Sequence, residues 1–261
     1  MKNLEIKKNK GLGLNFMLLI EFTIHMLFIL VAVLGKSFGK SSYPLYMLLD
    51  NYFMTCLLIN PIIISTIAKK VIEMEEKNNM WQLQASLGED ISNILVNKIA
   101  ILAIKIGILQ IIEWGIILLL ANRNPNLILD SSTITRLVIY FFSEYAINLF
   151  LLNLFMIIEM KSNKVYFSLF FSIIGAMSGI ICMLTSKVLS QINPFAWFVS
   201  ILNLSYTKQG GEFIQSINDI NYLTLIISLI CIIVEFIILK NINSYLLNKD
   251  LYCLLYTSPS P

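Results

Sequence analysis

Histidine is nearly absent from this chain, since His25 is the single one among 261 residues. A metal site built on paired histidines, such as HExxH, therefore cannot form within one chain, and we expect no bound metal. No GxxxxGK[ST] phosphate loop occurs, which excludes nucleotide binding in that cradle. A GxSxG nucleophile elbow is missing too. We therefore expect no catalytic residues, and ATP hydrolysis, if any, would reside in a partner chain.

Charged residues are also scarce, at 13% of the chain against 57% hydrophobic residues. The apolar residues gather into six runs of roughly 17–24 residues, long enough as helices to cross about 30 Å of hydrocarbon. No polar stretch is long enough to build a separate core. The sequence predicts an all-α integral membrane protein whose six transmembrane helices lie at Leu12–Leu34, Leu45–Ala68, Ile99–Ala121, Leu137–Ile158, Val165–Leu184 and Leu223–Leu239.

Cysteine is rare, with four in the chain. Three of them lie inside apolar runs and have neither disulfide nor zinc spacing, so we interpret Cys56, Cys182 and Cys231 as small buried hydrophobes. The fourth belongs to CLLYTSPSP (Cys253–Pro261), which resembles the translation of a transposon-end sequencing adapter. We treat 253–261 as an artefact and 1–252 as a single transmembrane domain.

The loops carry an uneven share of basic residues, which predicts the orientation. With the N-terminus inside, the cytoplasmic side holds twelve: Lys2, Lys7, Lys8, Lys10, Lys69, Lys70, Lys77, Lys98, Lys161, Lys164, Lys240 and Lys249. The outside holds six: Lys36, Lys40, Arg123, Arg136, Lys187 and Lys208. Both termini are therefore expected in the cytoplasm. The net charge of +3 reflects this topology, and we infer no nucleic-acid partner from it.

Several ionisable side chains fall within the predicted spans, where they are costly. Glu21 and His25 are four residues apart on one face of the first helix and can share a hydrogen bond. Glu113 lies near the middle of the third span and Glu144 in the fourth. These residues either line a polar or proton path or pair across helices to hold the bundle together. We favour pairing for most of them, with Glu21, His25 and Glu113 as the functional candidates.

The segment before the last span is apolar but interrupted. Pro194 breaks Val188–Leu204, which predicts a re-entrant or interface-lying pair of short helices on the outside. A polar outer loop with a turn at Gly210-Gly211 is expected to follow.

The sizeable polar segment Lys69–Lys98 connects the second and third spans. Its pattern predicts a break at Asn78-Asn79 and a short helix over Trp81–Leu87 that ends at Gly88. Asp90 or Ser92 is expected to cap the third span. Trp81 suits either an anchor for a protein partner or burial in the membrane interface, and the sequence leaves both open.

Within this segment, Glu73–Ile101 resembles the loop between the second and third helices of ABC-2 type permeases. In that family the loop begins with an acidic pair and a polar turn. A Trp and a Leu/Ser-rich stretch follow, and the next helix starts with a segment that contains Lys. The layout of six spans with a re-entrant outer element is similar as well. Within that family the chain most resembles permeases of lantibiotic and bacteriocin immunity and of peptide-antibiotic resistance. It departs from the family pattern at Asn79-Met80, Leu87-Gly88 and Glu89-Asp90.

The resemblance implies an ABC exporter subunit. In such permeases this loop bears a coupling helix that fits a separate ATPase, and the matching positions here are Glu75, Glu76, Lys77 and Trp81. Two permease subunits, as homo- or heterodimer, join two ATPases, which hold the ATP and Mg; this chain binds no cofactor directly. The cargo would be a hydrophobic or amphipathic peptide moved outward across the bacterial cytoplasmic membrane, with membrane lipid around the chain.

Two other classes stay open. An ATP-independent membrane immunity or sensing protein would share the same hydropathy and need no ATPase. A proton-coupled secondary transporter would use Glu21, His25 and Glu113 as proton sites.

Overall fold

A computed structural model describes most of the chain, over residues 12–35, 38–39, 41–77, 80–88, 90–127, 129–161, 166–209 and 212–241. The expected breaks at Asn78-Asn79 and Gly210-Gly211 lie outside the described residues, as does the adapter-like end 253–261.

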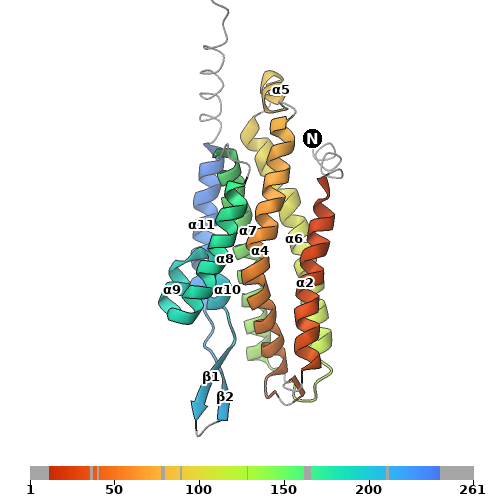
Figure 1. Ribbon diagram of the computed structural model, residues 1–261, viewed down its shortest axis with the longest axis vertical. Helices are drawn as coiled ribbons and strands as arrows, with labels where there is room; N and C mark the ends of the chain where they lie inside the picture. The colour runs from red at the N-terminus through yellow and green to blue at the C-terminus, as the bar shows by residue number, and fades with distance from the viewer. Residues whose placement is uncertain are drawn as a thin grey trace, which may run out of the picture.

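Six long apolar helices dominate the fold, each long and apolar enough to cross a membrane. The prediction of six long apolar helices is confirmed, and every predicted run falls largely within one helix. Figure 1 shows them side by side in one elongated bundle. They are α2 (Leu14–Leu34), α4 (Pro44–Lys77), α6 (Ile91–Ala121), α7 (Ser131–Lys161), α8 (Phe167–Thr185) and α11 (Tyr222–Lys240).

These helices differ in length in a way that sets the shape of the bundle. At 1.5 Å per residue, the 19 residues each of α8 and α11 span about 28 Å, close to the hydrocarbon thickness. The 34 residues of α4 span about 51 Å. The long helices therefore extend well past a bilayer's apolar layer, and the short helix α5 (Met80–Ser86) lies at one end of them (Figure 1).

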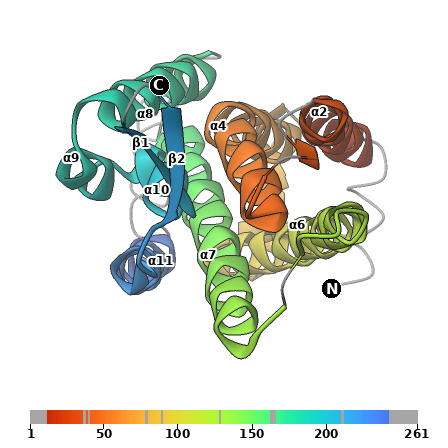
Figure 2. The same ribbon diagram turned by 90° about the horizontal axis from the view of Figure 1, so that it is seen from below.

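Two helices form the centre of the bundle. In its most apolar stretch, α7 is 67% buried and α4 is 56% buried, against 22% for α11. α4 packs against α2, α7 and α8, and α11 packs mainly against α7. Figure 2 shows α4 and α7 between the outer helices. The outer helices leave large apolar side chains such as Phe16, Ile111 and Ile233 exposed, which suits a lipid environment.

Short elements fill the connection between α8 and α11. They are α9 (Lys187–Ile192), η2 (Pro194–Ala196) and α10 (Trp197–Ser200), so the break expected at Pro194 separates short helices. Gly175 of α8 makes room for them, because a Cβ there would lie 2.5 Å from the ring of Phe195. η2 therefore packs directly on α8.

A two-stranded antiparallel sheet follows, with β1 (Leu204–Gln209) paired to β2 (Glu212–Ile217) from Leu204↔Ile217 to Gln209↔Glu212. The expectation of a polar loop here was wrong: the segments on both sides of the two-residue glycine connection, which favours a hairpin, form strands. Asp50 of α4 holds the start of the hairpin: its carboxylate accepts hydrogen bonds from the backbone N–H of Asn203 and Leu204 at 2.6 and 2.8 Å.

Candidate functional site

The first candidate region is the segment between α4 and α6. The predicted short helix is present as α5, and Gly88 follows it with a φ of 78°, in the left-handed region that ends helices. The Asp90 carboxylate then accepts a hydrogen bond from Ser92 N at 3.2 Å and caps α6, as expected. The chain therefore leaves α4, forms one separate short helix and re-enters the bundle.

Glu75 is not on the surface of this segment. It is fully buried, and its Oε1 accepts a hydrogen bond from Lys98 Nζ of α6 at 2.8 Å, with both side chains 0% exposed. A buried ion pair with one partner removed leaves an uncompensated charge, which is strongly unfavourable. Glu75 therefore ties the end of α4 to α6 in this structure, directly beneath α5.

The other predicted coupling residues lie differently. Trp81 is half-buried and packs against the apolar core. Glu76 is exposed, and the Lys77 side chain lies outside what the structure describes. The most exposed apolar side chains of this segment are Leu83, 52% exposed, and Leu87, 73% exposed. These two leucines present a small apolar surface at the end of the bundle that carries α5.

The second candidate region is a buried polar cluster that joins four helices. His25 Nδ1 of α2 lies 2.8 Å from Glu113 Oε1 of α6. The hydroxyl of Tyr52, on α4, lies 2.7 Å from Glu113 Oε2 and 2.5 Å from Glu144 Oε1 of α7. All four side chains are at least 95% buried. Residues 119 positions apart in the chain thus share one hydrogen-bonded network.

Two donors from α6 complete the site around Glu144. Trp114 Nε1 donates to Glu144 Oε2 at 2.6 Å, and Gln110 Nε2 donates to the same oxygen at 3.2 Å. Gln110 Nε2 also donates to the Phe141 carbonyl at 2.8 Å. The Glu144 carboxyl group is therefore held by three other side chains.

The Tyr52 hydroxyl lies between the two glutamates of this cluster. A tyrosine hydroxyl carries one hydrogen, so Tyr52 can donate to only one of its two carboxyl neighbours. The other contact is a hydrogen bond only if that carboxyl group is protonated and donates to the tyrosine oxygen. The Tyr52 hydroxyl therefore bridges Glu113 and Glu144 and brings the two carboxyl groups, from α6 and α7, to one oxygen atom.

Glu21 is buried beside this cluster, at 5% exposure. The expected pair of Glu21 with His25 is not formed: His25 turns its Nδ1 to Glu113 across the bundle. Among the described residues, Glu21 Oε2 and His25 Nε2 have no hydrogen-bond partner. The four-residue spacing places both on one face, but the position of α6 against that face decides which of them is bonded.

The cluster lies closer to the hairpin end than to the α5 end. Tyr52 is eight residues from the first residue of α4, and Glu113 is eight residues from the last residue of α6, each about 12 Å by helical rise. Helices α4 and α6 then run on toward α5. The cluster and the Glu75–Lys98 pair therefore occupy different levels of the same two helices.

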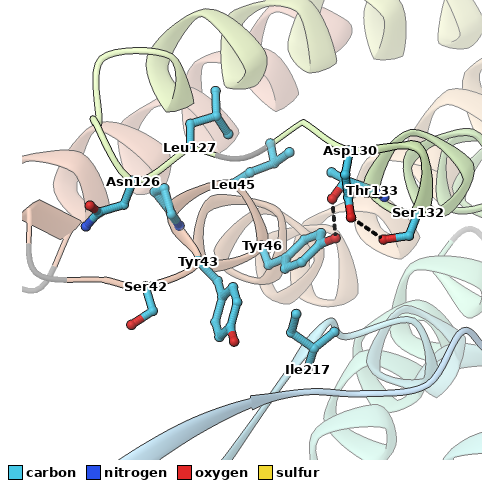
Figure 3. A pocket seen from close by; sticks show the side chains of 11 residues that line it. Ser42, Tyr43, Leu45, Tyr46, Asn126, Leu127, Asp130, Ser132, Thr133 and Ile217 are labelled. Carbon is cyan, nitrogen blue, oxygen red and sulfur yellow. Dashed lines mark hydrogen bonds between the residues drawn. The ribbon is translucent and has the colours of Figure 1, made fainter.

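A pocket of about 160 Å³ opens at the hairpin end between the start of α4 and the segment before α7. Figure 3 shows Tyr43, Tyr46 and Ile217 around it, with the Tyr46 hydroxyl donating to Thr133 Oγ1 at 3.1 Å. Hydrogen bonds from Thr133 and Ser132 lower the pKa of Asp130 to about 2, so its carboxylate stays charged in this pocket.

Comparison with known proteins adds no relative: no family model, curated protein or solved structure matches this chain. Sequence reasoning found Glu21, His25, Glu113 and Glu144 but missed Tyr52, Gln110 and Trp114. Gln110, Glu113 and Trp114 share one face of α6 by their three- and four-residue spacing, and this pattern was the available signal.

Proposed function

We propose that this chain is the membrane-spanning permease subunit of an ABC exporter. The observation that carries the proposal is α5, a separate short helix between two long helices at one end of the bundle, with Leu83 exposed on it and Leu87 exposed directly after it. An exposed apolar pair at a polar end suits docking to a protein partner. The resemblance of Glu73–Ile101 to ABC-2 permeases makes that partner an ATPase, which would supply ATP and Mg.

The Glu75–Lys98 ion pair next to α5 would transmit a movement of α5 to the long helices. A partner that moves α5 would move the ends of α4 and α6 together, because Glu75 and Lys98 join them at 2.8 Å. α4 packs against α2, α7 and α8, so its displacement would reach most of the bundle. A second permease subunit would complete the translocation path between two such bundles.

The proposed cargo is a hydrophobic or amphipathic peptide, as in lantibiotic immunity or peptide-antibiotic resistance. Its support is the resemblance together with the apolar surface of the outer helices, from which a membrane-partitioned molecule could enter. In this proposal the chain lies in the bacterial cytoplasmic membrane with both termini and α5 inside, and α9 and α10 form the re-entrant outer element.

The buried cluster favours a second candidate, a proton-coupled secondary transporter. A His, a Tyr and three glutamates within the bundle can hold and share protons. Proteoliposomes that contain this chain alone would then move protons when substrate is added, and Glu113→Gln would abolish the movement. Wild-type vesicles that move no protons would leave the cluster as structural pairing.

Co-purification tests the exporter proposal. The DNA on both sides of the reading frame would be sequenced, and any adjacent ATPase with a phosphate loop would be co-expressed with the chain. We expect the double variant Leu83→Glu/Leu87→Glu to lose the ATPase, because two charges replace the docking leucines. Trp81→Ala should also weaken ATPase binding, since it removes the packing that positions α5.

A matched control is Leu129→Glu, which places the same charge at an exposed leucine, 54% exposed, next to α7 at the other end of the bundle. This variant should retain the ATPase. Equal recovery of the ATPase with all variants, or a neighbourhood that encodes no ATPase, would contradict the proposal.

A further inference from the structure

A second pocket at the hairpin end has about 410 Å³ of space, within the roughly 300–1,000 Å³ typical of small-molecule sites. Its wall comes from α9, α10, the start of β1 and the segment that leads into α11. The polar residues that line it are Lys187, Ser190, Gln191, Ser200, Ser205, Asn218, Asp219 and Asn221.

The depth of this pocket is set by the two shortest spanning helices. α8 and α11 each have 19 residues, about 28 Å, close to the hydrocarbon thickness, so we place their ends at the edges of the hydrocarbon layer. Lys187 comes two residues after the end of α8, and Asp219 comes three residues before the start of α11. The pocket therefore lies at the level of the lipid headgroups.

The α9 helix separates a polar wall from an apolar surface. Lys187, Ser190 and Gln191, spaced as one helix face, line the pocket. Val188 and Ile192, off this face of the helix, are 62% and 72% exposed, and Leu184 at the end of α8 is 74% exposed. A molecule with a polar head and apolar chains can therefore place its head in the pocket and its chains beside α8 and α9.

Both signs of charge are present in this pocket. Lys187 supplies a cation and Asp219 an anion. Neither side chain forms a hydrogen bond or ion pair with another residue in the part of the chain that the structure describes. Both charges are thus available to a ligand that carries a phosphate and an ammonium group.

We propose that this pocket binds the headgroup of phosphatidylethanolamine, with the phosphate at Lys187 and the ammonium at Asp219. The lipid, and not free phosphoethanolamine, is the occupant because the exposed apolar side chains of α8 and α9 adjoin the polar wall. The site is independent of the proposed export function, since it uses neither α5 nor the buried cluster.

Lipid retention measures this directly. The purified chain would be reconstituted in nanodiscs that contain equal amounts of phosphatidylethanolamine and phosphatidylglycerol, then released and examined by native mass spectrometry. We expect the wild type to retain more phosphatidylethanolamine than phosphatidylglycerol. Lys187→Gln should lower its retention at least about tenfold, as expected for the loss of one charged hydrogen bond.

Asp219→Asn should retain lipid but lose the preference for ethanolamine over glycerol headgroups, because it removes only the partner of the ammonium. Lys161→Gln, an exposed lysine at the α5 end, is the matched control and should behave as wild type. Soluble phosphoethanolamine should not displace the lipid. The proposal is overturned if the wild type shows no headgroup preference, if Lys187→Gln and Lys161→Gln retain equal lipid, or if the soluble compound competes.

Discussion

Tyr52 is the residue on which the buried cluster depends. Its one hydroxyl contacts carboxyl groups from two other helices, at 2.7 and 2.5 Å. Inside lipid, an unsatisfied polar group has no water to turn to, so each of these contacts replaces hydration. Tyr52 therefore allows Glu113 and Glu144 to face each other in the interior of the bundle.

Replacement of Tyr52 by Phe should lower the free energy of unfolding by about 1–3 kcal/mol, because two buried carboxyl groups lose their shared partner. Reversible unfolding in mixed micelles would measure this change. The matched control is Tyr145→Phe, which removes one hydroxyl bonded at 3.2 Å to the Ala103 carbonyl. That loss should be near the 0.6 kcal/mol typical of a single hydrogen bond within a membrane. Equal losses in the two variants would show that the cluster has no special role in stability.

At the scale of residues, the sequence identified the buried ionisable side chains but not which of them contact each other. Charged residues in apolar runs stand out, so Glu21, His25, Glu113 and Glu144 could be identified one by one. Their partners depend on the rotation and depth of each helix, which a single sequence does not specify. Tyr52 and Trp114 escaped notice because tyrosine and tryptophan are common in membrane helices.

At the scale of elements, α4 connects the two ends of the molecule. Near its start Asp50 accepts hydrogen bonds from Asn203 and Leu204, and near its end Glu75 pairs with Lys98. The six spans were predictable because length and hydropathy alone define them. The hairpin was not predicted, because the polar composition of its two segments is also typical of a loop, and the carboxylate that anchors its start belongs to Asp50, more than 150 positions away in the sequence.

Asp50→Ala should release the start of the hairpin from α4. Two backbone N–H groups, of Asn203 and Leu204, would lose their acceptor, so their amide hydrogen exchange should accelerate by at least about tenfold. Hydrogen exchange with mass spectrometry would measure this in micelles. Asn51→Ala is the neighbouring control, because the Asn51 side chain donates only within its own helix, to the Met47 carbonyl at 2.8 Å. Unchanged exchange in Asp50→Ala would mean that the apolar contacts of α10 hold the hairpin without the carboxylate.

At the scale of the whole molecule, the bundle has two chemically different ends. One carries α5 and the exposed leucines Leu83 and Leu87, and the other carries the hairpin, the short helices α9 and α10 and the two pockets described above. The twelve-to-six distribution of basic residues favours the α5 end in the cytoplasm. An ATPase partner requires the same orientation, because ATP is on that side. The distribution of basic residues and the proposed ATPase partner thus both place the α5 end in the cytoplasm.

Cysteine accessibility tests this orientation on two exposed leucines at opposite ends. In a chain whose own cysteines are replaced by alanine, Leu129→Cys should react with a membrane-impermeant maleimide added to intact cells. Leu87→Cys, which is 73% exposed on the α5 end, should react only after the membrane is permeabilised. The opposite pattern would reverse the topology and remove the ATPase from reach of α5. Reaction of both residues in intact cells would place both ends of the bundle on one side, which helices of about 28–51 Å that cross the bilayer do not permit.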